Sequence, residues 1–84
     1  MKVIEMTGKT TEFGFKTKEE FLEALAPYGF VKGAMKKKNN TVDILVTNSK
    51  DSITSKMELA KELGIEIMTY GELADLFGVE PAEE

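Results

Sequence analysis

The sequence contains no cysteine, no histidine and no tryptophan among its 84 residues. Without cysteine the chain forms no disulfide, which fits a reducing intracellular setting. Without cysteine and histidine it also has no thiol nucleophile, no imidazole general base and no Cys/His zinc site. These absences argue against most enzyme classes, and no nucleophile–base pair is visible among the residues that remain.

Long apolar runs are missing as well. The strongest, Ile44-Leu45-Val46, is far too short to span a membrane, and residues 1–6 lack the apolar stretch of a signal peptide. Apolar residues make up 42% of the chain and charged residues 31%, as in ordinary globular proteins. We therefore expect one small domain over residues 1–79, followed by an acidic tail or the start of a linker at 80–84. Its expected setting is intracellular: cytoplasmic in a bacterium or phage, nuclear in a eukaryote.

The charges are distributed unevenly, although the formal net charge is only −4. Residues 1–50 carry nine lysines and six acidic residues, whereas residues 51–84 carry two lysines and nine acidic residues. Because binding responds to the local potential, an acidic average does not exclude a partner that carries phosphate. A solvated surface on which charges happen to cluster explains the pattern equally well.

Three segments match the Ser/Thr-x-x-Glu capping box that opens helices, and each precedes apolar residues at helical spacing. These boxes are Thr17–Glu20, Ser55–Glu58 and Thr69–Glu72. The helices are expected to end near Pro27–Gly29, at Gly64 and at Gly78, because glycine tolerates the backbone conformation that follows a helix. Ser52 and Thr54 are alternative caps for the second helix.

Four strands are expected between these helices: Lys2–Met6, Phe30–Met35, Asp43–Thr47 and Ile65–Met68. The first and third are almost continuously apolar, as in strands covered on both faces, whereas the other two suit sheet edges. The sequence thus predicts an α/β fold with a four-stranded parallel sheet in the order 2-1-3-4, flanked by three helices. One alternative stays open, because the polar segment Lys36–Thr41 is also typical of an antiparallel hairpin.

Residues 43–77 resemble the second half of a BRCT domain, in particular those of bacterial NAD-dependent DNA ligases and of the large subunit of the eukaryotic clamp loader. The resemblance is carried by Ser55-Lys56 at a helix start, by the turn Glu62–Ile65 and by Thr7-Gly8 after the first strand. The chain departs from the family in lacking a tryptophan in the last helix and in the length of the segment Lys9–Lys16. The resemblance implies a parallel sheet in the order 2-1-3-4 and favours the parallel alternative.

The same resemblance implies a phosphate site formed by Thr7, Gly8 and Lys56. They would supply a hydroxyl group, a backbone N–H and a lysine at the start of the second helix, where the helix dipole favours an anion. The carboxyl ends of adjacent central strands meet at this edge of the sheet, where open parallel sheets bind ligands. Each residue also has a simpler interpretation, as part of a turn or as a solvated helix residue.

Lys9, Lys16 and Lys18 precede or begin the first helix and are candidates for contacts to a DNA backbone, whereas Lys36–Lys38 is interpreted as a solubilising loop. The resemblance implies a non-catalytic module, without cofactor or metal, that recognises the 5′-phosphate end of duplex DNA in replication or repair. The alternative is a protein-interaction module that binds a phosphopeptide or an unmodified partner. A purely architectural domain is a third possibility.

Overall fold

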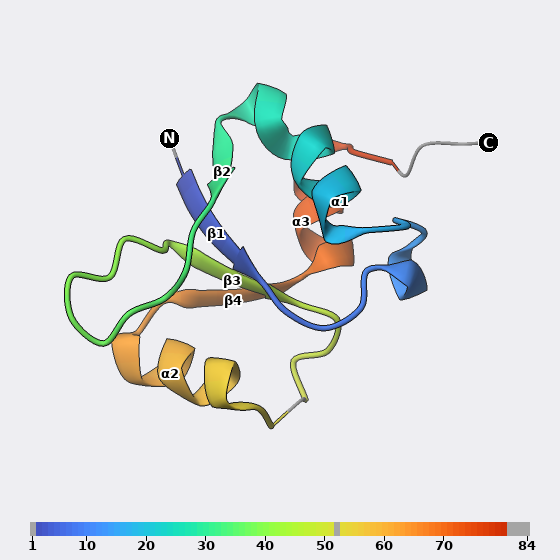
Figure 1. Cartoon of the computed structure of the whole chain (residues 1–84). Helices are drawn as coiled ribbons and strands as arrows, with labels where there is room; N and C mark the ends of the chain where they lie inside the picture. The colour runs from blue at the N-terminus through green and yellow to red at the C-terminus, as the bar shows by residue number, and fades with distance from the viewer. Residues whose placement is uncertain (1, 52, 81–84) are drawn as a thin grey trace.

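A computed structural model describes residues 2–51 and 53–80 of the chain. Its four strands are β1 (Lys2–Met6), β2 (Phe30–Lys32), β3 (Ile44–Thr47) and β4 (Glu66–Thr69). All of them run parallel, in the order β2-β1-β3-β4 (Figure 1). The predicted α/β fold is therefore confirmed, while positions 81–84 of the expected tail lie outside the described residues.

The two apolar strands are central, as their composition predicts. β1 lies between β2 and β3, with Glu5 opposite Leu45, and β3 in turn pairs with β4. The hairpin alternative for Lys36–Thr41 is wrong, because this segment belongs to a crossover that returns the chain to the start of β3. Asn40 orders a local turn inside that crossover by accepting from the Val42 N–H and donating to the Val42 carbonyl.

β2 is shorter than the sequence predicts. It ends at Lys32, and Gly33 then makes the last backbone bond to β1, from its N–H to the Ile4 carbonyl. A Cβ at Gly33 would collide with the side chain of Val3. Beyond this point the Met35 N–H donates to the Glu5 carboxylate, not to a backbone carbonyl, so the ladder is replaced by a side-chain contact.

The helices begin at threonine caps. α1 (Lys18–Leu25), α2 (Ser55–Leu63) and α3 (Tyr70–Phe77) follow Thr17, Thr54 and Thr69, whose hydroxyl groups accept from backbone N–H groups in the first turn. The cap of α2 is Thr54, so the box predicted at Ser55–Glu58 is off by one residue. Gly64 and Gly78 end α2 and α3 as predicted, whereas α1 continues into the 3-10 helix η2 (Ala26–Tyr28) before Gly29.

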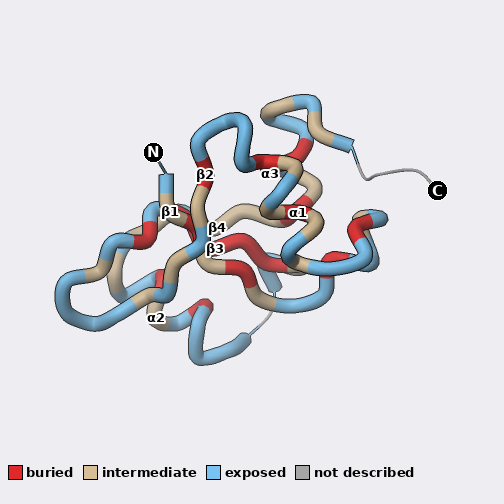
Figure 2. Tube along the Cα trace, turned by 45° about the horizontal axis from the view of Figure 1, so that its top comes forward, coloured by how far each residue is buried: buried red, intermediate tan, exposed pale blue. Residues whose placement is uncertain are grey.

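The helices cover both faces of the sheet. α1 and α3 pack on one face, around Phe21, Leu25 and Tyr70, and α2 packs on the other through Met57 and Ala60 (Figure 1). All four residues of β3 are buried, and this strand forms a continuous buried stretch in Figure 2. The loop at the carboxyl end of β1 begins with Thr7 and Gly8 of the predicted site and is held to the core by Phe15, whereas Lys56 lies on the first turn of α2.

Candidate functional site

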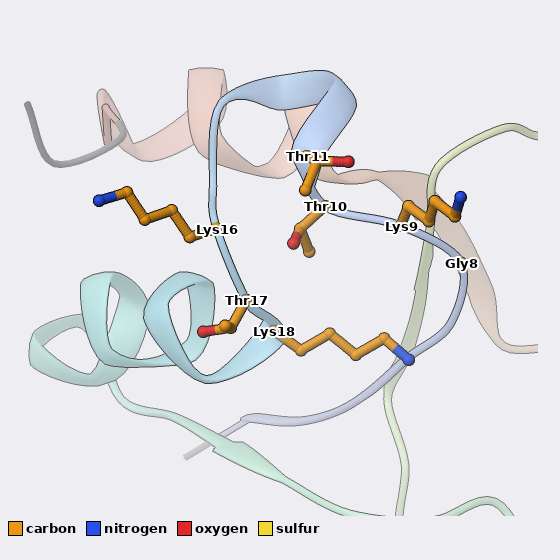
Figure 3. Close-up of a pocket in the computed structure, with 7 residues that line it drawn as sticks. All are labelled: Gly8, Lys9, Thr10, Thr11, Lys16, Thr17 and Lys18. Carbon is orange, nitrogen blue, oxygen red and sulfur yellow. The ribbon is translucent and has the colours of Figure 1, made fainter.

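A pocket of about 380 Å³ lies beside the loop that follows β1. It is lined by three lysines, three threonines and a glycine: Lys9, Lys16, Lys18, Thr10, Thr11, Thr17 and Gly8 (Figure 3). This lining contains no carboxylate. The three lysines that the sequence predicts for a DNA backbone are thus brought together with one residue of the predicted phosphate site.

Aromatic anchors hold the loop that carries these residues. The 3-10 helix η1 (Thr11–Phe13) places Phe13 against the ring of Tyr70, and Phe15, which is 1% exposed, packs edge-to-face on Phe21. The buried Thr10 hydroxyl donates to the Phe15 carbonyl at 3.0 Å. Lys9 and Lys16 therefore extend from a backbone that the core fixes at two points.

The start of α1 forms the other wall of the pocket. The Thr17 hydroxyl accepts from the Glu20 N–H at 3.0 Å, and the Glu20 carboxylate accepts from the Lys16 N–H at 2.7 Å. This arrangement differs from a full capping box, in which the glutamate would bond to the cap residue itself. It fixes the chain direction on entry to the helix, so that Lys18 begins α1 beside the pocket.

Two of the lysines lie on the side of the pocket where Gly8 is found. In Figure 3 the side chains of Lys9 and Lys18 extend toward that side, whereas Lys16 extends the opposite way. Within residues 2–51 and 53–80, neither Lys9 nor Lys18 forms an ion pair. Neither ammonium group is therefore paired with a described carboxylate.

The end of β1 is fixed by one hydrogen bond within the sheet and by another from α3. The Thr7 N–H donates to the Val46 carbonyl at 2.8 Å, which extends the β1–β3 ladder by one residue. The Tyr70 hydroxyl donates to the Thr7 carbonyl at 2.9 Å, and burial raises the pKa of this phenol well above its usual range. Tyr70 is therefore a neutral, permanent donor, and the Gly8 N–H that follows forms no hydrogen bond within the described part of the chain.

Lys56 lies apart from the pocket. Its ammonium group is 3.2 Å from the carboxylate of Glu5, which is 13% exposed and also accepts from the Met35 N–H. Alternation along β1 places Thr7 on the same face as Glu5, the face that α2 covers. The predicted trio is thus divided: Gly8 lines the pocket, whereas Thr7 and Lys56 do not.

No protein-family model, curated protein or solved structure matches this chain. The BRCT resemblance therefore rests on the residues quoted above and on the sheet order it implies. None of the described helices has the length and apolar character needed to cross a bilayer. Nor do residues 2–51 and 53–80 contain a group of three or more potential metal-binding side chains.

Several residues of this region were not predicted from the sequence. Thr10, Thr11 and Thr17 line the pocket, and Tyr70 fixes the end of β1 across 63 positions of sequence. The run Lys9-Thr10-Thr11 directly after Gly8 was a usable signal, because small polar residues after a central strand are suited to binding an anion. No local pattern marks Tyr70, since its contact depends on how α3 packs.

Proposed function

We propose that this chain is a non-catalytic module that binds phosphate, and that its ligand is the 5′-phosphate end of duplex DNA in an intracellular replication or repair setting. The observation that carries the proposal is the pocket beside Gly8, whose lining holds three lysines and no carboxylate. The sheet order is the one that the resemblance to BRCT domains implies. That resemblance supports a DNA end over other phosphate ligands.

The site suits a phosphate for electrostatic reasons. Lys9 and Lys18 supply positive charge on the Gly8 side, and the Gly8 N–H supplies a donor that points to no described partner. Hydrogen bonds between charged groups and phosphate oxygens are shorter and stronger than neutral ones. Thr7 and Lys56 are candidates for a further contact from the α2 face, although Lys56 must then share its charge with Glu5.

We expect weak and salt-sensitive binding, because one small site and a few lysines neutralise few phosphates. The test is a chemical-shift titration of the protein with two nicked or recessed duplexes that differ only in the 5′-phosphate. The phosphorylated duplex should bind more tightly and should shift the amide signals of residues 7–18. A phosphopeptide of mixed sequence serves as the third ligand.

The outcomes separate the candidate functions. Equal affinity for the two duplexes overturns recognition of the end and leaves only general attraction to DNA. Tighter binding of the phosphopeptide than of either duplex favours the protein-interaction alternative. Thr7→Val, which keeps the β-branched shape and removes the hydroxyl donor, tests whether Thr7 adds to the preference.

A further inference from the structure

We propose that Asn48, the residue that follows β3, is a phosphate-contacting residue of the site described above. The inference rests on the proposed function and deepens it by naming a side chain that selects the terminal phosphate. It starts from a contact between the two central strands at their carboxyl ends. There the Asn48 carboxamide occupies the space beside Gly8 that any larger residue would need.

The contact is close and depends on glycine. Gly8 has a φ of +77°, and a Cβ at this position would collide with the Asn48 carboxamide oxygen. The Asn48 carboxamide is thus packed against the backbone of the residue that lines the pocket. Asn48 does not line the pocket itself but adjoins it at Gly8, and the atom nearest Gly8 is the carboxamide oxygen. A half-turn of the carboxamide brings its NH2 group toward a ligand oxygen that is bound at the Gly8 N–H.

Both sides of this contact are fixed before any ligand arrives. The Thr47 hydroxyl, in a side chain that is 1% exposed, accepts from the Ser49 N–H and donates to the Ser49 carbonyl, each at 3.3 Å. These bonds hold the backbone on either side of Asn48. On the other strand the Tyr70 hydroxyl holds the Thr7 carbonyl. Binding therefore requires only the carboxamide to turn, while the backbone on both sides of the contact stays in place, which limits the cost of ordering.

The Asn48 side chain has hydrogen-bond donors that are not in use among the described residues. It is partly exposed, and within residues 2–51 and 53–80 it forms no hydrogen bond. An asparagine amide supplies two N–H donors. Donation to a phosphate oxygen satisfies them at the sheet edge where parallel α/β folds bind their ligands. Lys9 and Lys18 then neutralise the charge, and Asn48 with Gly8 orients the phosphate.

The experiment compares Asn48→Asp with Asn39→Asp. Both variants add one negative charge, but Asn39 is exposed and belongs to the crossover between β2 and β3. This crossover lies on the opposite side of the molecule from the loop that follows β1 (Figure 1). Asn39 has a φ of +58°, a conformation that aspartate also tolerates. The readout is the ratio of affinities for the 5′-phosphorylated and the unphosphorylated duplex at one salt concentration.

Asn48→Asp should abolish the preference, because its carboxylate repels the phosphate and offers no donor. We expect at least a roughly tenfold fall in affinity for the phosphorylated end, as for one lost hydrogen bond to a charged group. Asn48→Ala should reduce the preference, and Asn39→Asp should keep it. The amide spectrum of each free variant verifies its fold.

The results distinguish this inference from the function on which it rests. If the wild-type protein shows no preference for the phosphorylated end, both are overturned. If the wild-type protein shows the preference and folded Asn48→Asp keeps it, Asn48 is not a ligand while the proposed function stands. If Asn39→Asp loses the preference as fully as Asn48→Asp, net charge and not the Asn48 contact explains the result.

Discussion

The sequence predicts the position of Lys56 correctly, but the structure gives it a partner that the sequence does not predict. Its position on the first turn of α2 follows from the sequence, but its ion pair with Glu5 does not, because Glu5 reaches it from β1. A charged residue in a central strand is uncommon, and the Glu5 carboxylate is stabilised there by Lys56 and by the Met35 N–H. Lys56 therefore has a structural role that an exposed lysine normally lacks.

We predict that Lys56→Ala lowers the free energy of unfolding by about 1 kcal/mol. This value lies between the small contribution of an exposed ion pair and the larger loss when one partner of a buried ion pair is removed. Lys56 is half-exposed, whereas Glu5 is mostly buried. The sequence alone predicts a smaller loss for an exposed helix residue. Urea denaturation of Lys56→Ala, Glu5→Gln and the double variant measures the coupling, and additive losses would contradict a direct interaction.

At the residue scale, the sequence predicts where a residue lies in the fold better than it predicts which residues it contacts. Gly8 is predicted from its place after β1, and the structure gives it the positive φ that glycine favours. The contacts of Asn48 and Tyr70 join segments that are distant in sequence, so they depend on the packed fold. No periodicity or cap signal encodes such contacts.

Among the elements, α3 begins with the most complete set of interactions. Thr69 and Glu72 exchange hydrogen bonds with each other's backbone, and Lys50 contacts the Glu72 carboxylate at 2.8 Å. The capping box was predictable because its two residues are three positions apart. The contact from Lys50 was not predictable, because Lys50 lies in the loop after β3, far from Glu72 in the sequence.

These bonds predict a pH dependence at the start of α3. The hydrogen bond from Lys50, followed by that from the Thr69 N–H, lowers the pKa of Glu72 below its ordinary value. A lowered folded-state pKa contributes stability above the unfolded-state value, and this contribution is lost as the pH falls through the folded-state value. It should therefore begin to decrease as the pH falls below about 4.5, the ordinary value, and be lost completely only below the lowered folded-state pKa.

Glu72→Gln keeps an acceptor for the capping box but removes the charge. We expect the variant to be slightly less stable than the wild-type protein at pH 7, with the difference shrinking as the pH falls below about 4.5. Thermal unfolding of both proteins, from pH 7 to pH values below about 4.5, measures this difference in stability. Glu12→Gln, at an exposed carboxylate of η1, is the control. A difference for Glu72→Gln that grows on acidification would contradict the assignment.

In the whole molecule, the lysines of the basic first half of the sequence lie in separate places. Lys9 and Lys18 gather at the pocket, whereas Lys36–Lys38 lies in the crossover on the opposite side of the sheet (Figure 1). Sheet order was predictable because burial patterns report which strands are central. The parallel direction of β3 was not predictable from these patterns, and only the BRCT resemblance favoured it over a hairpin. The path of the loop after Gly8 was not predictable either, because Phe13 lies in the single short turn η1 and Phe15 in the irregular segment that follows it.

This separation predicts different salt dependences for two sets of lysines. Replacing Lys9 and Lys18 with Gln should reduce the slope of log affinity against log salt concentration by about one per lysine, because each neutralises one phosphate. Replacing Lys36–Lys38 with Gln should leave the slope closer to that of the wild-type protein. Binding curves at four salt concentrations measure both slopes, and a larger change for the second set would place the DNA on the crossover side.

The position of β1 also determines how the fold resists mechanical force. The strand nearest the N-terminus is central, so a pull applied there loads the ladders to β2 and β3 together, in shear. A pull applied beyond Phe77 meets α3 instead, and a helix can unwind one turn at a time. An unfolding motor that threads the chain from the C-terminal side should therefore need less work to start than one that enters from the other side.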